Sequence, residues 1–181
     1  MFKWFFPLIL ISACWLLALS PFSSKAEQWS YSVDYIQGEG DVQGIKMAAQ
    51  FHTDWLRDYS EHLHLYFESS VNFWEYGEQN SHDTNFVLAL SPVIWYPLGT
   101  VANKPLYVEF GIGVSFLSDT NFAGKDVSTH YQFEDRLGLV YPLDDEHSHH
   151  VALRYFHYSN AGFKKPNPGL DFISLSYLHY F

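Results

Sequence analysis

The sequence contains a single cysteine and few basic residues, with ten Lys and Arg against twenty Asp and Glu and a formal net charge of −10. One cysteine excludes a disulfide framework within the chain. The shortage of positive charge argues against a nucleic-acid-binding protein, which would carry a basic stripe. A mean hydropathy of −0.13 leaves no room for a bundle of transmembrane helices. The 181 residues allow one domain, and an aromatic content of 19% excludes a disordered chain.

The N-terminal segment has the pattern of a secretory signal peptide. A positively charged start is followed by uncharged residues 4–19 and then by small polar residues. We therefore expect residues 1–26 to be cleaved and residues 27–181 to form the mature domain. A retained anchor is one alternative, but the apolar segment contains Pro7 and is shorter than the roughly 20 residues of a helical span. Lipoprotein processing at Cys14 is another alternative.

Apolar and polar residues alternate through most of the mature chain, which predicts strands rather than helices. The alternation is unbroken in residues 106–116, where every even-numbered residue is apolar. Gly-, Pro- and Asn-containing breaks separate the alternating segments, as expected of turns. Eight strands are predicted, at residues 29–37, 45–56, 63–74, 86–96, 106–116, 131–141, 151–159 and 173–177.

Eight alternating strands fit either a soluble sandwich or lipocalin-like barrel, with the apolar face inside, or an outer-membrane barrel, with that face toward lipid. The strands are long enough to cross a bilayer when tilted. Their polar faces carry Glu68, Glu109, Glu134 and Arg136, as a filled polar interior requires. The final strand ends on Phe181, like the terminal signal that the barrel-assembly machinery recognises during insertion. We therefore predict an all-β, eight-stranded antiparallel transmembrane β-barrel in the bacterial outer membrane.

The number and order of the predicted strands also assign the connections to the two ends of the barrel. If both termini are periplasmic, the connections near residues 38–44, 77–84, 118–129 and 160–170 are extracellular. Arg154 falls on the inward face, where we expect it to pair with an interior acid such as Glu109 or Glu134. Aromatic residues near strand ends are candidates for interfacial girdles. These candidates are Trp74, Tyr76, Trp95, Tyr96, Tyr141 and Tyr180.

Candidate chemistry gathers at the end of the seventh predicted strand. His157 and Ser159 are two residues apart, so on a strand they point to the same side. Asp171 opens the returning strand and would lie beside them if the intervening loop closes. Ser, His and a carboxylate within mutual reach form an acyl-transfer triad. By its parity the triad faces outward near the extracellular rim, where ionisable groups are costly without a purpose and where an enzyme acting on a membrane lipid would place its nucleophile.

These residues resemble those of the PagL-type lipid A 3-O-deacylases, which are eight-stranded outer-membrane barrels. That family carries a His-x-Ser-Asn motif near the end of its seventh strand and a carboxylate twelve residues after the Ser, as this sequence does. The resemblance implies that His157 is the general base, Ser159 the nucleophile and Asp171 the orienting acid, with Asn167 in the oxyanion hole. The best-known member has Glu at the acid position. Asp171 is one methylene shorter, which changes the geometry of the acid more than the class of reaction.

The implied reaction is hydrolysis of the ester-linked acyl chain at the 3-position of lipid A in lipopolysaccharide, without a metal or organic cofactor. Asn160 would shape the site, and a backbone N–H near Gly162 would be a second oxyanion donor. Lys164 and Lys165 either meet phosphates of the substrate head group or are solvated loop lysines. A lipid-facing nucleophile also makes a homodimer through that surface conceivable.

Other functions remain open from the residues alone. The chain could be a noncatalytic structural or adhesive outer-membrane barrel, or an outer-membrane esterase acting on phospholipid. The acidic and His-rich residues 144–150 look like a metal cluster. The strand count places them in a periplasmic turn, so we expect a solvated turn there and no metal site.

Overall fold

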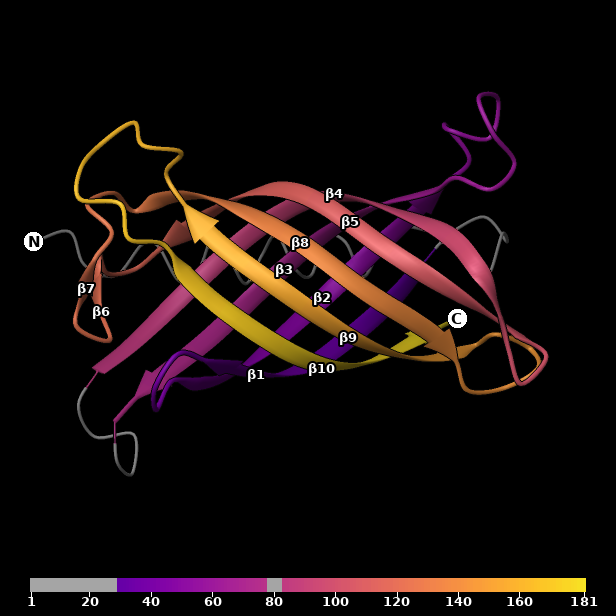
Figure 1. Ribbon diagram of the computed structural model, residues 1–181, viewed down its shortest axis with the longest axis horizontal. Coiled ribbons are helices and arrows are strands. Elements are labelled where there is room, and N and C mark those ends of the chain that lie inside the picture. Colours follow the sequence, from indigo (N-terminus) through magenta and orange to yellow (C-terminus); the bar gives the residue numbers. More distant parts are fainter. Residues whose placement is uncertain (1–28, 78–82) are drawn as a thin grey trace, which may run out of the picture.

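The computed structural model describes residues 29–77 and 83–181. The predicted signal peptide and the alternative processing at Cys14 lie outside these residues. Eight long strands close an antiparallel barrel in the order β1-β10-β9-β8-β5-β4-β3-β2 (Figure 1). They are β1 (Trp29–Gly38), β2 (Gln43–Thr53), β3 (His64–Tyr76), β4 (Asp83–Val101), β5 (Lys104–Leu117), β8 (Tyr131–Pro142), β9 (His149–Ser159) and β10 (Leu170–Tyr180).

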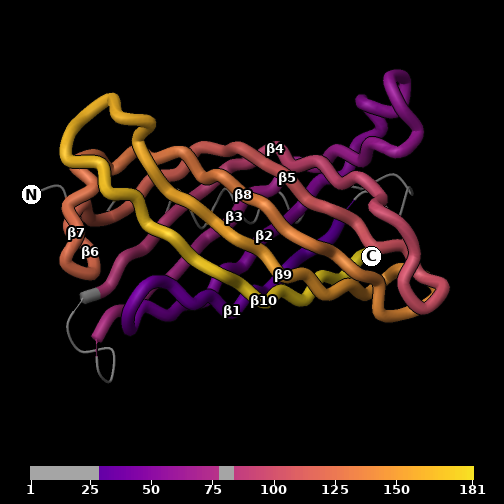
Figure 2. Tube along the Cα trace, viewed as in Figure 1, coloured from indigo at the N-terminus to yellow at the C-terminus, as the bar shows by residue number. Residues whose placement is uncertain are grey.

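The predicted eight-stranded barrel is thus confirmed, and the register explains why it closes. Each long strand pairs with the next long strand along the chain, and β1 pairs with β10 to remove the last open edge. The strands are tilted, and the C-terminus lies at the opposite end from the loop of residues 160–169 (Figure 2). Among the described residues, no helix is long and apolar enough to cross a bilayer.

Two features of the connections differ from the prediction. β4 and β5 continue beyond the expected break and turn only at Ala102 and Asn103, which have φ values of 47° and 66°. Gly99 falls at a register irregularity inside this hairpin rather than in a loop. Residues 118–130 also contain a small hairpin, formed by β6 (Asn121–Phe122) and β7 (Lys125–Asp126). It lies at the same end of the barrel as the 160–169 loop (Figure 1).

The middle of the barrel is filled by a buried ionic network. Arg154 Nε lies 2.8 Å from Glu109, as expected, and its Nη1 lies 3.0 Å from Asp34. Lys46 and Arg136 meet the remaining interior carboxylates in the same way. Buried charges are costly unless they are paired, and each charged side chain of this network has a partner of opposite charge, with only Asp34 Oδ1 and Arg136 Nε left unbonded among its described atoms. Its members are Asp34, Lys46, Glu68, Glu109, Glu134, Arg136 and Arg154.

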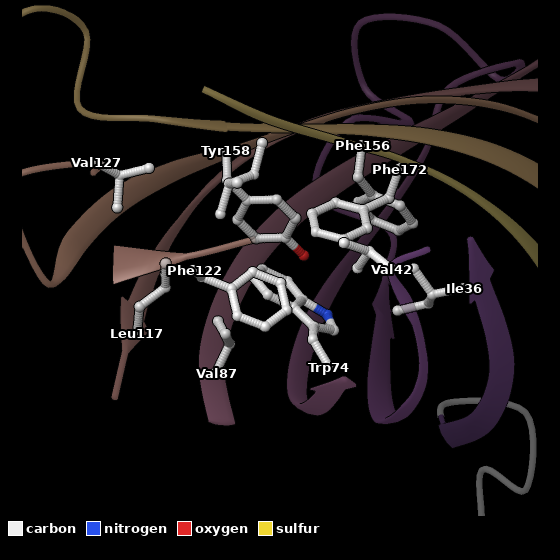
Figure 3. Close-up of a cluster of buried hydrophobic side chains, with 11 residues drawn as sticks. Ile36, Val42, Trp74, Val87, Leu117, Phe122, Val127, Phe156, Tyr158 and Phe172 are labelled. Carbon is white, nitrogen blue, oxygen red and sulfur yellow. The ribbon is translucent and has the colours of Figure 1, made fainter. Parts of the chain in front are cut away.

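Aromatic clusters occupy the barrel above and below this network. Trp74 is 1% exposed and its ring centroid lies 4.4 Å from that of Phe172 and 4.9 Å from that of Tyr158 (Figure 3). The prediction that Trp74 and Trp95 belong to an interfacial girdle is therefore wrong, because both side chains point inward. Tyr96, by contrast, is exposed on the outside. The cluster around Trp74 therefore packs against the inner side of β9 and β10 near the 160–169 loop.

The outer surface of the barrel is apolar, as a membrane barrel requires. The side chains that alternate with the interior residues are exposed Val, Ile, Leu, Phe and Tyr on every long strand. On β9 and β10 this outward set includes Leu153, Ile173 and Leu175. The candidate site continues the same face toward the loop end.

Candidate active site on the outer surface

His157 and Asp171 form a direct pair across β9 and β10. Their Cα positions are register partners, and His157 Nδ1 lies 2.7 Å from Asp171 Oδ1. Both side chains are about one-third exposed, on the outer surface of the barrel. Ser159 follows on the same face of β9 and is half-buried beside its partner Phe133 on β8. Among the described residues no hydrogen bond joins Ser159 to the imidazole, a bond that is often long in unliganded enzymes.

Tyr155 is a member of this constellation that the sequence motif does not include. It stands two residues before His157 on the outward face of β9, and its hydroxyl donates to Asp171 Oδ1 at 2.5 Å. His157 and Tyr155 therefore bond the same carboxylate oxygen. Strand alternation could have indicated Tyr155 from the sequence, since residues 155, 157 and 159 share one face of β9. Asp171 pairs with His157, the middle residue of the three.

Gly169 brings the loop against the imidazole of His157. It is buried with φ +71°, and a Cβ at this position would lie 2.5 Å from His157 Cε1. Only glycine allows both the left-handed backbone and this close approach. The Gly169 carbonyl accepts a hydrogen bond from Lys125 Nζ at 3.1 Å, and Lys125 also pairs with Glu39. The β6–β7 hairpin and the β1–β2 turn thereby hold the loop in place.

Asn160 organises the first half of the loop from a buried position. Its Nδ2 donates to the carbonyls of Val127 and Lys164, at 3.1 and 3.0 Å, and its Oδ1 accepts the Gly162 N–H at 2.9 Å. The Asn160 N–H itself donates to Asn167 Oδ1 at 3.1 Å. Asn160 therefore shapes the loop directly after Ser159 and holds Asn167 beside it.

The remaining loop residues are less closely joined to the triad. The Gly162 N–H is occupied by Asn160 in this conformation, so it serves the loop rather than an open oxyanion position. Lys164 is exposed, and its Nζ donates to the Ser128 carbonyl at 3.0 Å. Lys165 is exposed on the same loop. A cavity of about 210 Å³ adjoins Asp171 on its other side, and its lining includes Lys125.

The His-rich turn after β8 is built by hydrogen bonds within the turn. Asp144 accepts bonds from the Ser148 hydroxyl, at 2.5 Å, and from the Ser148 and His149 N–H groups. The Ser148 hydroxyl bond is the main cause that holds the pKa of Asp144 below its usual range. Across the described residues, no group of three or more His, Cys, Asp or Glu side chains could hold a metal ion.

Comparison with known proteins identifies this arrangement. The family described as lipid A 3-O-deacylase (PagL) matches residues 43–180, which include β2 to β10 and the whole candidate site. The chain belongs to the PagL family. The lipid A deacylase PagL of Bordetella bronchiseptica is 32% identical over 169 residues, covering 91% of this chain and 92% of the relative. That of Pseudomonas aeruginosa is 29% identical over 171 residues, covering 94% and 95%.

A solved structure supports the same assignment. The crystal structure of the outer membrane enzyme PagL matches with a TM-score of 0.66 at 25% identity, covering 84% of this chain and 99% of that one. This PagL-family chain is accordingly a closed barrel of the outer membrane, and the resemblance read from the His-x-Ser-Asn motif is confirmed.

Proposed function

We propose that this chain hydrolyses the acyl ester at the 3-position of lipid A with Ser159 as nucleophile, His157 as general base and Asp171 as orienting acid. Its family membership makes the chain a lipid A 3-O-deacylase, a carboxylic ester hydrolase of the outer membrane. One observation carries the residue roles: His157 Nδ1 lies 2.7 Å from Asp171 Oδ1, with Ser159 on the same outward face of β9.

The chemistry follows from this pairing. The bond to Asp171 keeps the imidazole proton on Nδ1, so Nε2 is available as the base. Nε2 takes the Ser159 hydroxyl proton while Oγ attacks the ester carbonyl. When the tetrahedral intermediate collapses, the imidazolium of His157 protonates the departing sugar oxygen and the acyl chain stays on Ser159. Water, deprotonated by the imidazole, then releases the fatty acid and restores the serine.

Asn167 is the proposed donor to the developing oxyanion. Its Oδ1 accepts the N–H of Asn160, the residue after Ser159, which orients the amide and leaves its Nδ2 hydrogens free for this role. A preorganised donor of this kind is worth about 10²–10³ in kcat. Gly162 contributes to the same region by closing the turn around Asn160.

The position of the site supports a substrate that approaches from within the membrane. The triad continues the apolar outer face of β9 and β10 at the loop end, so an acyl chain can lie along the barrel while its ester reaches Ser159. Lys164 and Lys165 are exposed on the loop that adjoins the site, with Lys164 Nζ bonded to the Ser128 carbonyl. We assign them to head-group attraction, a contribution that salt would screen.

Export and assembly complete the proposal. Residues 1–26 act as a signal peptide that is cleaved before the barrel inserts. The last strand, β10, ends beside Phe181, which is 62% exposed and fits recognition by the barrel-assembly machinery. The outward apolar surface of two copies would also allow a homodimer in the bilayer.

The test is mass spectrometry of lipid A from cells that express the intact chain or Ser159→Ala. The intact protein should remove one acyl chain, and Ser159→Ala should lower the rate by at least about three orders of magnitude. Ser69→Ala is the matched control, because Ser69 is also exposed on the outer surface but lies on β3. Heat-dependent gel mobility establishes that each variant forms the barrel.

The alternatives predict different results. Unchanged lipid A with a folded barrel would favour a noncatalytic barrel, and loss of acyl chains from phospholipid alone would favour a phospholipid esterase. Deacylation of lipid A that persists in Ser159→Ala would refute the nucleophile assignment while leaving the activity intact.

A further inference from the structure

A tyrosine completes a three-residue chain of hydrogen bonds around the acid. The Tyr155 hydroxyl lies 2.5 Å from Asp171 Oδ1, and His157 Nδ1 lies 2.7 Å from the same atom. Both donors come from β9, and the acceptor comes from β10. Because His157 and Asp171 are register partners and Tyr155 is opposite Ile173, Tyr155 reaches the carboxylate diagonally from two residue pairs further along the strands.

We propose that Tyr155 is a positioning residue that acts through Asp171 and fixes the carboxylate against His157. This inference rests on the proposed triad and extends it by one member. Tyr155 is 45% exposed on the outer surface. Its hydroxyl is therefore directed along the surface to Asp171, rather than held in the core by packing.

The need for such a residue comes from the freedom of the acid. The terminal torsion of an Asp side chain is broad, so a partly exposed carboxylate can turn either oxygen toward its partner. One donor from His157 constrains the distance but leaves the carboxylate plane free to rotate. A second donor on the same oxygen removes that rotation. Tyrosine suits the task, because its ring has only two side-chain torsions and places the hydroxyl far from the backbone.

The arrangement also separates positioning from substrate binding. Tyr155 lies on the far side of His157 from Ser159 along β9, and its hydroxyl is already committed to Asp171. Loss of that hydroxyl should therefore disturb the orientation of the base without removing a contact to the ester. The expected result is a lower kcat with an unchanged KM.

The experiment measures initial rates of the purified full-length barrel on lipid A in mixed micelles. Tyr155→Phe should lower kcat by about 10- to 100-fold, by analogy with the loss of outer-shell groups that orient metal-binding side chains. Tyr35→Phe is the matched control, since Tyr35 is exposed on the outside of β1 and its hydroxyl bonds Gln37. Heat-dependent mobility establishes that both variants retain the barrel.

A double-mutant cycle separates positioning from other roles. If Tyr155 acts only through Asp171, Tyr155→Phe should have no further effect in an Asp171→Ala background. Equal losses in both backgrounds, a rise in KM alone, or an unchanged rate in Tyr155→Phe would each overturn the inference. Ser159→Ala is assayed in parallel. Full activity of Ser159→Ala would refute both the proposed triad and this inference. An inactive Ser159→Ala together with a fully active Tyr155→Phe would refute this inference alone.

Discussion

Gly169 sits so close to the His157 imidazole, the proposed general base, that one added methyl group should disable the enzyme. A Cβ built on Gly169 lies 2.5 Å from His157 Cε1 and 3.3 Å from Nε2, whereas ordinary contact begins at 3.4 Å. In Gly169→Ala the ring must therefore retreat by about 1 Å or turn. Neither movement preserves both the bond to Asp171 and the approach to Ser159.

The size of the effect can be worked from this displacement. A misplacement of about 1 Å in a catalytic group costs about 10²-fold in rate. The left-handed backbone at φ +71° adds about 1–2 kcal/mol of instability for a residue with a Cβ. We expect Gly169→Ala to lose about 99% of its activity on lipid A while the barrel stays folded, because Gly169 lies outside the paired residues of β9 and β10.

Gly40→Ala separates the two costs. Gly40 has φ +66° in the β1–β2 turn, and a Cβ there meets nothing within 4 Å. It carries the same backbone penalty without touching His157. Rates are measured by release of fatty acid from lipid A, and folding by heat-dependent mobility. A Gly169→Ala enzyme as active as wild type, or one no worse than Gly40→Ala, would refute the reasoning.

Other variants test separate parts of the molecule. Arg154→Met leaves Asp34 buried without a cation and Glu109 with only its longer ion pair to Arg136, so the free energy of unfolding should fall by about 3–5 kcal/mol, measured by urea titration in vesicles; an unchanged midpoint would contradict the network. Asn160→Ala should lower activity at least about tenfold with little change in that midpoint, because its side-chain partners all lie in loops, so the lost bonds loosen the loop after Ser159 and not the strands. Dialysis against a chelator should leave the rate unchanged, since the proposed nucleophile, base and acid all come from the chain; activity restored only by added metal would refute this.

The barrel could be predicted because its physics is periodic. Strict alternation in residues such as 106–116 defines which side chains face outward, and eight such segments close without an edge. The same parity, applied consistently, would have placed Trp74 inside, because it shares its face with Glu68 and Asn72. The error came from treating position near a strand end as sufficient evidence for an interfacial residue.

The site was predictable where it depends on one strand and less so where it depends on a loop. The spacing of His157 and Ser159 follows from strand geometry, and the facing of Asp171 follows from register once the loop closes. The closeness of Gly169 to His157 depends on the path of residues 160–169, which no periodicity describes. The β6–β7 hairpin that anchors this path was equally hidden, because two-residue strands are too short to show alternation.

The outward position of the proposed triad also determines how the enzyme meets its substrate. The interior of the barrel is filled by paired charged side chains and aromatic rings, so no substrate reaches Ser159 through the lumen. The enzyme therefore meets lipid A by lateral diffusion within the membrane. The concentration that governs the rate is the number of lipid A molecules per unit area of membrane. Adding inert lipid to the membrane while the bulk concentration of lipid A is held constant should slow the reaction in proportion to the fall in lipid A per unit area, an effect known as surface dilution.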